Sequence, residues 1–119
     1  MLQSNKITSF TSLIVWQKSI LLVKNVYHLA GQFPKDEIYG LSSQMKRAAI
    51  SIPSNIAEGY SRKGTKEYSH FLYIAYGSSN ELETQIIIAK DLYKNIDCSA
   101  TELLLEEVLK MLNVMIEKL

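Results

Sequence analysis

The side chains best suited to chemistry in this sequence are the basic ones in residues 60–66, Tyr-Ser-Arg-Lys-Gly-Thr-Lys. The cations Arg62, Lys63 and Lys66 follow closely on the aromatic ring of Tyr60. Lysine and arginine neutralise phosphates, and an aromatic ring stacks on a nucleobase. The segment therefore predicts a site for RNA or DNA. The alternative is an ordinary solvated turn whose charges bind nothing.

Other cations extend this hypothesis along the first half of the chain. Residues 1–66 contain nine Lys or Arg and three acids, whereas residues 67–119 contain four Lys or Arg and nine acids. The net charge is only +1 and the pI about 7.8, so total charge alone does not indicate a nucleic-acid-binding protein. The additional candidates for phosphate contacts are Lys18, Lys24 and Lys46. Arg47 belongs either to this group or to an internal polar cluster.

That polar cluster is predicted from side chains that recur at spacings of three and four. Its members are Arg47, Ser51, Asn55, Glu58, Ser78 and Glu81. Residues with this spacing share one face of a helix, so we expect two helices to meet along these positions. Arg47 would pair with Glu58 or Glu81, because a half-buried charge without a partner costs several kcal/mol. The alternative is a solvated face.

No enzyme motif in the sequence has the residues and the order that its chemistry requires. Residues 59–66 resemble a phosphate-binding loop, but Thr precedes Lys and a helix precedes the segment where the motif requires a strand. His28 and His70 have no His or Cys at i+3 or i+4 to form a metal pair. Glu58 and Glu81 lack the Glu-x-x-His partner of a di-metal bundle site. We therefore expect no catalytic residue, no metal and no cofactor.

Four helices must position these side chains, at approximately residues 12–31, 40–60, 65–94 and 99–118. The clearest inner face, in the third helix, alternates spacings of four and three. It comprises Tyr68, Leu72, Ala75, Ser79, Leu82, Ile86, Ala89 and Tyr93. At 1.5 Å per residue this helix spans roughly 43 Å. Because short loops favour antiparallel neighbours, residues 1–119 are predicted to form one elongated, all-α, antiparallel up-down four-helix bundle.

The other helices have inner faces of the same kind. The first is expected to use Leu13, Trp16, Ile20, Val23 and Tyr27. The second is expected to use Leu41, Met45, Ala48, Ile52 and Ile56. The fourth is expected to use Leu105, Val108, Leu112, Met115 and Leu119. Surplus aliphatic residues indicate an oligomer interface, or alternatively a broad core face. They are Ile14, Leu21, Leu22 and Leu103.

Local signals predict how the helices begin, bend and end. Thr11 or Ser12 would cap the first helix, and Gly31 would end it in a left-handed turn. Pro53 removes a backbone hydrogen bond inside the second helix, so a kink is expected there. Ser99 with Glu102 three residues later would form a capping box for the fourth helix. These signals are consistent with four separate helices.

Composition bears on the environment of the protein. There is no run of 18 apolar residues, so no membrane span is expected. Residues 1–6 lack the apolar core of a secretory signal. The single cysteine, Cys98, excludes an internal disulfide framework and suits a reducing compartment. We therefore expect a cytoplasmic protein in which Cys98 lies in a polar turn.

Two segments carry a resemblance to a known family. Residues 44–59, QMKRAAISIPSNIAEG, resemble the signature of small bacterial four-helix-bundle proteins encoded in intervening sequences of 23S ribosomal RNA genes. Residues 71–85 are similar to the third helix of that family, and residues 16–18 and 33–34 match its N-terminal landmarks. The resemblance extends roughly from Leu13 to the end. The accessory protein of diversity-generating retroelements, which partners a reverse transcriptase, belongs to the same wider group.

The resemblance implies an up-down four-helix bundle, a ring-shaped homopentamer and a role in binding nucleic acid. Basic turns repeated around such a ring would strengthen a weak phosphate site by multivalency. The alternative is that the ring docks a protein, such as a reverse transcriptase or a ribosomal component, without touching nucleic acid. A purely structural bundle is the third possibility.

Overall fold

The computed structural model describes residues 9–119, and this part of the chain contains helices and no strand. The α-helices are α1 (Ile14–Ala30), α2 (Leu41–Tyr60), α3 (Thr65–Leu92) and α4 (Ser99–Lys118). Two short 3-10 helices, η1 (Phe10–Ser12) and η2 (Lys35–Glu37), precede α1 and α2. The prediction of an all-α protein with four helices is confirmed.

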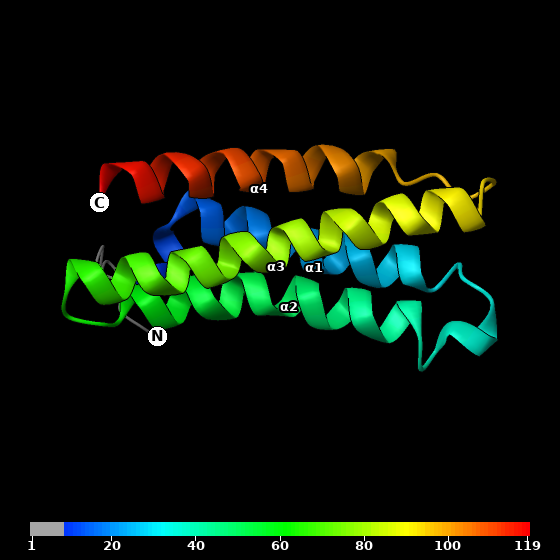
Figure 1. Ribbon diagram of the computed structural model, residues 1–119, viewed down its shortest axis with the longest axis horizontal. Coiled ribbons are helices and arrows are strands. Elements are labelled where there is room, and N and C mark those ends of the chain that lie inside the picture. Colours follow the sequence, from blue (N-terminus) through cyan, green and yellow to red (C-terminus); the bar gives the residue numbers. More distant parts are fainter. Residues whose placement is uncertain (1–8) are drawn as a thin grey trace.

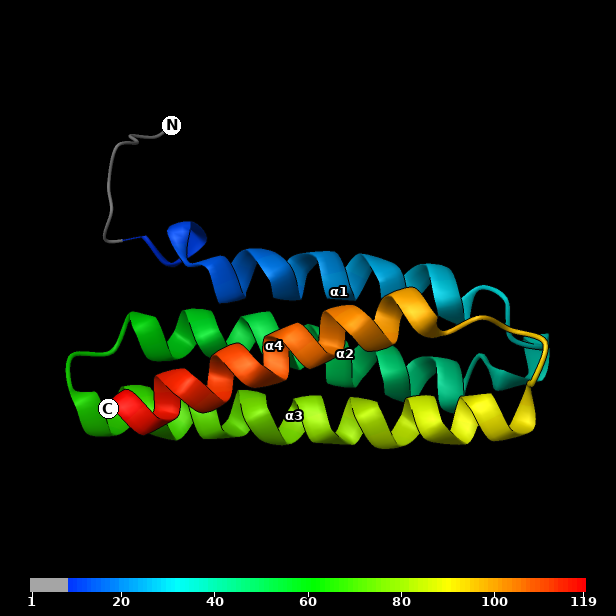
Figure 2. The ribbon, with the colours of Figure 1, turned by 90° about the horizontal axis from the view of Figure 1, so that it is seen from above.

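The helices lie side by side along the long axis, and each starts near the end of the molecule where the previous one stops (Figure 1). Helix α1 packs against α2 and α4, and α3 packs against the same two helices. Seen from above, α4 lies over the space between α1 and α3 (Figure 2). The longest dimension is 43 Å. Helix α3, with 28 residues, accounts for this length, since it spans about 42 Å.

The α2–α3 pair makes the most extensive helix contact and is held together at one end and in the middle. In the middle, the Ser78 hydroxyl donates to the Ser51 hydroxyl at 2.8 Å. At one end, a Cβ placed on Gly59 would lie only 2.8 Å from the Cβ of Phe71. Real Cβ atoms do not approach so closely, so glycine permits the contact between these two helices.

The core is formed by the faces predicted for α2, α3 and α4, with helix ends less buried than helix centres. Met45, Ile52, Leu72, Leu82 and Leu112 are completely buried. The ends of the predicted faces behave differently, because fewer neighbours cover them. Residues there that stay partly or largely exposed are Leu41, Tyr68, Tyr93, Met115 and Leu119.

The inner face predicted for α1 is wrong. The side chains that point to the core are Val15, Ser19, Leu22, Val26, Leu29 and Ala30. Trp16, Ile20 and Val23 are only half-buried, and Tyr27 is exposed. Two apolar stripes lie side by side on this helix, and spacing alone does not say which one faces the centre. The predicted stripe covers the edge between α1 and α2 instead.

The same error affects the surplus aliphatic residues. Leu22, expected at the surface, is completely buried. Ile14, Leu21 and Leu103 are exposed as expected. On α1 the apolar residues left outside the core are therefore different ones: Leu22 is buried, whereas Tyr27, which was expected in the core, is exposed.

The predicted cap of α1 does not form. The N-cap position is Leu13, which has no capping side chain, while the Ser9 hydroxyl accepts the Thr11 N–H of the preceding 3-10 helix. Gly31 has a φ of −65°, so α1 ends in right-handed and not left-handed backbone. The 3-10 helix η1 leads directly into α1, and its last backbone hydrogen bond runs from the Leu13 N–H to the Phe10 carbonyl, so Leu13 takes the N-cap position in place of Thr11 or Ser12.

The predicted capping box at the start of α4 does not form either. The Asp97 carboxylate accepts the Ser99 N–H at 2.9 Å, and Glu102 pairs with Lys90 of α3 at 2.8 Å. Cys98, expected in a polar turn, is buried among apolar side chains, and this burial raises the pKa of its thiol. The capping carboxylate thus comes from the residue that precedes Cys98.

Candidate functional site

The α2–α3 turn, residues 61–64, lies at one end of the bundle, at the left in Figure 1. Its arginine is already engaged. The Arg62 guanidinium donates to the Glu58 carboxylate at 2.6 and 3.0 Å and lies 3.8 Å from the Glu67 carboxylate. Its central carbon lies 5.0 Å from the centre of the Phe71 ring. Two carboxylates therefore offset the charge of Arg62 and hold its side chain in place.

The two lysines at this turn are in a different state. Lys63 and Lys66 are exposed, and neither makes an ion pair with a residue in 9–119. Tyr60 is half-buried, and its ring meets the Tyr68 ring edge-on at a centroid distance of 6.0 Å. Two ammonium groups thus face solvent beside an aromatic pair and a neutralised guanidinium.

The remaining cationic candidates lie elsewhere. Lys18 pairs with Glu107 of α4 at 3.3 Å, whereas the Lys46 ammonium lies 4.8 Å from the centre of the Tyr27 ring on α1. Lys24 is exposed and precedes Tyr27 by about one helical turn. Lys46 is 14 positions before Tyr60, or roughly 21 Å along the axis of α2. The structure therefore separates Lys24 and Lys46 from the α2–α3 turn, and the candidates do not form one patch.

The predicted polar cluster forms only in part. The Asn55 amide donates to the Ser51 carbonyl at 2.8 Å and to its hydroxyl at 2.9 Å, and that hydroxyl also accepts from Ser78. These three residues link α2 to α3. Asn55 and Ser51 are four residues apart on the same helix, which is the spacing from which their contact was predicted.

The pairing expected for Arg47 is wrong. Arg47 is exposed, and no carboxylate within residues 9–119 forms an ion pair with it. Glu58 pairs instead with Arg62, which lies four residues further along the chain. The Glu81 carboxylate accepts a hydrogen bond from the Gln85 amide at 3.4 Å. The amide oxygen of Gln85 is buried and accepts no hydrogen bond from the described part of the chain.

One polar contact has no counterpart among the sequence-based expectations. The Tyr93 hydroxyl donates to one oxygen of Glu37, and the Leu41 N–H donates to the other at 3.0 Å. These hydrogen bonds hold the pKa of Glu37 below its usual value, and the Glu37 contact raises the pKa of Tyr93 to about 12. The two residues are 56 positions apart, so no local signal indicated the pair.

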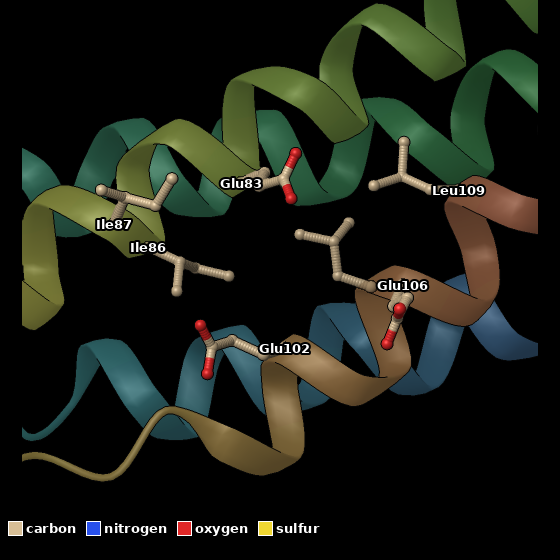
Figure 3. A pocket seen from close by; sticks show the side chains of 7 residues that line it. Glu83, Ile86, Ile87, Glu102, Glu106 and Leu109 are labelled. Carbon is tan, nitrogen blue, oxygen red and sulfur yellow. The ribbon is translucent and has the colours of Figure 1, made fainter.

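A groove with acidic side chains lies between α3 and α4, with a volume of about 320 Å³. Figure 3 shows the Glu83 and Glu102 carboxylates directed into the space that also holds Ile86. Glu106 adds a third carboxylate from α4. Glu102 and Glu106 have lysine partners, at 2.8 Å from Lys90 and at 3.7 Å from Lys110, whereas Glu83 pairs with no cation among residues 9–119.

Metal sites and membrane spans do not account for these features. No group of three or more His, Cys, Asp or Glu side chains within residues 9–119 is arranged to hold a metal ion. None of the helices in that range is both long and apolar enough to cross a membrane. The charged turn and the grooves between helices are therefore the features that remain to be explained.

Comparison with known families gives a context for these features. The family described as 23S rRNA-intervening sequence protein matches residues 11–114. The chain belongs to this family. For this 23S rRNA-intervening sequence protein, the match includes α1, α2, α3, the α2–α3 turn and most of α4. No curated protein matches the chain.

Proposed function

We propose that this 23S rRNA-intervening sequence protein is a non-enzymatic binding protein that associates with RNA or DNA through the α2–α3 turn. The observation that carries the proposal is the pair of exposed ammonium groups of Lys63 and Lys66, which no described carboxylate neutralises. Two phosphates along one strand would offset these charges and release counterions. The resemblance to the 23S rRNA-intervening sequence proteins, which implies a role in binding nucleic acid, supports the same partner.

Arg62 has a supporting role in this proposal. Because Glu58 and Glu67 compensate its charge, it contributes less to phosphate binding than Lys63 or Lys66. Its contacts with both α2 and α3 instead hold the turn in one conformation. A turn held in place loses less conformational freedom when a ligand binds.

The proposed protein is a cytoplasmic, antiparallel up-down bundle, kinked at Pro53, that assembles into a ring of five copies. The order of contacts along α2 and α3 supports the antiparallel arrangement, since Gly59 meets Phe71 and Ser51 meets Ser78. Pro53 lies inside α2, which continues on both sides of it. Each copy would add two lysines to one rim of the ring, and linked weak sites bind more tightly than one alone.

The test is fluorescence anisotropy of labelled structured RNA and DNA across a salt series. We expect the logarithm of the affinity to fall linearly with the logarithm of salt concentration. The Lys63→Glu/Lys66→Glu variant should bind weakly, with a salt slope smaller by about one for each phosphate that is no longer neutralised. The matched control is Lys35→Glu/Lys94→Glu, which reverses two exposed lysines at the opposite end of the bundle and should bind like the unaltered protein.

Equal losses in both variants would show that only net charge matters and would refute a site at the turn.

A second function is favoured by the apolar residues exposed along the outer faces of α3 and α4, where Ile87 is 61% and Leu103 is 66% exposed. These surfaces suit a protein partner. If the assembled protein binds neither nucleic acid at low salt, the function is docking of another protein.

A further inference from the structure

The outer face of α3 continues from the α2–α3 turn along the side of the bundle. Among the described helices, α3 packs only against α2 and α4, and it runs along one edge of the molecule (Figure 2). Positions three and four apart share a helix face, so one row of side chains lies opposite the buried Leu72, Ala75 and Ser79. From the turn onward this outer face comprises Lys66, His70, Tyr73, Gly77, Asn80 and Thr84, and all six are exposed.

The outer face of α3 is suited to an anionic ligand. It begins with the ammonium group of Lys66, next to that of Lys63 in the turn, and none of its six residues is acidic. Helices α3 and α4 together carry eight carboxylates, so a row of this length without one is distinct from the rest of their surface. A phosphate chain that starts at the turn can therefore follow this face.

Tyr73 is the aromatic side chain of the outer face. It is 60% exposed, and no other aromatic ring in the described part of the chain contacts it. The rings nearer the turn have contacts within the protein, since Tyr60 meets Tyr68 and Phe71 meets the Arg62 guanidinium. A large exposed ring without such a contact is available to stack on a base.

Gly77 leaves one side of the Tyr73 ring uncovered. Helical side chains lean toward the N-terminus, so the residue four positions after an aromatic one covers part of its ring. Gly77 has no side chain to do so, and a Cβ placed on it would meet nothing within 4 Å. Glycine inside a helix is destabilising relative to alanine, and no helix contact requires it here. The open space beside the ring is consistent with close approach of a ligand.

The spacing along α3 fits a nucleic-acid strand. Lys66 precedes Tyr73 by seven positions, or about 10 Å along the helix axis. This distance corresponds to about three nucleotides of a stacked strand, at roughly 3.4 Å for each. A base inside a duplex is covered on both faces by its neighbours, whereas an unpaired strand can turn a base onto a protein ring. Lysine and ring together therefore favour an unpaired strand.

We propose that the ligand of this site is a single-stranded nucleic acid, whose phosphates contact Lys63 and Lys66 while one of its bases stacks on Tyr73 beside Gly77. The strand runs from the turn along the outer face of α3. This inference rests on the proposed function and deepens it, because it names the unpaired strand as the ligand. Tyr73 is the residue that distinguishes such a strand from a duplex.

The test is fluorescence anisotropy at low salt with the full chain and labelled strands of about 12 nucleotides, a length within the site sizes of proteins that bind single strands. The probes are an RNA without self-complementarity, the DNA of the same sequence, and the duplex of each with its complement. Either unpaired strand should bind at least about tenfold more tightly than its duplex. Recognition of phosphates alone would favour the duplex, because its charge density is higher.

Variants of the outer face test the role of the ring. Tyr73→Ala should weaken binding of the unpaired strands by about 5- to 150-fold, the range for loss of one stacking ring, and leave duplex binding unchanged. Tyr73→Phe keeps the ring and should bind like the unaltered protein. Gly77→Leu should weaken strand binding while far-UV circular dichroism shows full helical content, because leucine covers the ring. The matched control is Tyr39→Ala, which removes a 95% exposed ring at the opposite end of the bundle.

A labelled strand of the same length that lacks its bases separates stacking from phosphate contacts. Tyr73→Ala should bind this abasic strand as tightly as the unaltered protein does. Its salt slope should also be unchanged, because the ring neutralises no phosphate. Lys63→Glu/Lys66→Glu should bind the abasic strand weakly, since this variant lacks the two cations.

The outcomes separate this inference from the proposed function. Binding of the duplex as tight as that of the unpaired strand would overturn the inference, and so would unchanged strand binding by Tyr73→Ala. An equal loss in Tyr39→Ala would also overturn it, because the ring of Tyr73 would then have no special place. If Lys63→Glu/Lys66→Glu still loses nucleic acid in these cases, the proposed function stands. If the unaltered protein binds no probe, both are refuted.

Discussion

Replacing Gly59 with alanine provides a direct test of how closely α2 and α3 approach. The added Cβ would lie 2.8 Å from the Cβ of Phe71, 3.1 Å from a ring carbon of Tyr68 and 3.3 Å from the Tyr68 carbonyl oxygen. None of these atoms is the far end of a flexible side chain, so relief requires the two helices to move apart. The matched control is Gly77→Ala in the middle of α3, where the added Cβ meets nothing within 4 Å.

The magnitudes follow from two opposing effects. Alanine favours a helix over glycine by about 0.5–1 kcal/mol. Overpacking a tight contact costs typically about 1–3 kcal/mol. The difference between these ranges is a loss of free energy of unfolding of up to about 2.5 kcal/mol for Gly59→Ala, with a midpoint of about 1.3 kcal/mol. For Gly77→Ala, only helix propensity acts, and the free energy of unfolding rises by about 0.5–1 kcal/mol. For a domain of this size, about 4 °C of melting temperature corresponds to 1 kcal/mol.

We therefore expect Gly59→Ala to melt about 5 °C below the unaltered protein and Gly77→Ala about 2–4 °C above it. The assay is thermal unfolding followed by far-UV circular dichroism, with urea unfolding as a second measurement. The reasoning is refuted if Gly59→Ala melts at the same temperature as the unaltered protein or higher. Similar shifts in the two variants would mean that helix propensity alone acts and that the close approach is absent.

Two further predictions concern polar groups. The lowered pKa of Glu37 means that its contacts stabilise the fold above its unfolded pKa and are lost as pH falls through its folded value. The hydrogen bond of the Tyr93 hydroxyl stabilises the fold fully below pH 10.0, and this contribution is lost as pH rises toward about 12. The free energy of unfolding of Tyr93→Phe, measured by urea titration, should therefore depend less on pH at both the acidic and the alkaline end of the range. Gln85→Leu removes a buried oxygen without a donor and should raise the free energy of unfolding by about 1 kcal/mol. The exposed control Gln44→Leu should change it by less than about 0.5 kcal/mol, and a destabilised Gln85→Leu would contradict the argument.

The helices and three of their inner faces were predictable from local information. Alternating spacings of three and four place Leu72, Leu82 and Ile86 on one face of α3 whatever the partner helix is. On this helix the other faces are more polar, so one stripe is clearly preferred. The same holds for Met45 and Ile52 on α2. Local spacing likewise predicted that Asn55 and Ser51, one turn apart on α2, share a face, and the Asn55 amide donates to the Ser51 hydroxyl.

The first helix shows where this reasoning fails. Trp16 and Leu22 belong to two neighbouring apolar stripes, and either one satisfies the helical period. Which of the two stripes is buried depends on the helices that pack against α1, namely α2 and α4. The stripe that lies between these two contact surfaces faces the centre of the bundle. No property of α1 alone contains that information.

The candidate site was predictable only as a set of charges. The sequence places Arg62, Lys63 and Lys66 in one turn, but it does not say that Glu58 and Glu67 approach only the arginine. It also does not separate Lys46 from the turn. Charge and spacing determine which groups can interact on one helix, because neighbours three or four positions apart always share a face.

Contacts between helices depend on their register and tilt, which the packing of the whole core decides. The pairing of Glu37 with Tyr93 and the position of Glu83 in the α3–α4 groove are examples. In this protein the sequence by itself therefore determined the four helices and most of their apolar faces. The tertiary structure alone decided which charges meet between helices, as Lys90 meets Glu102, because such an ion pair requires two side chains that are distant in the sequence to lie within a few ångströms.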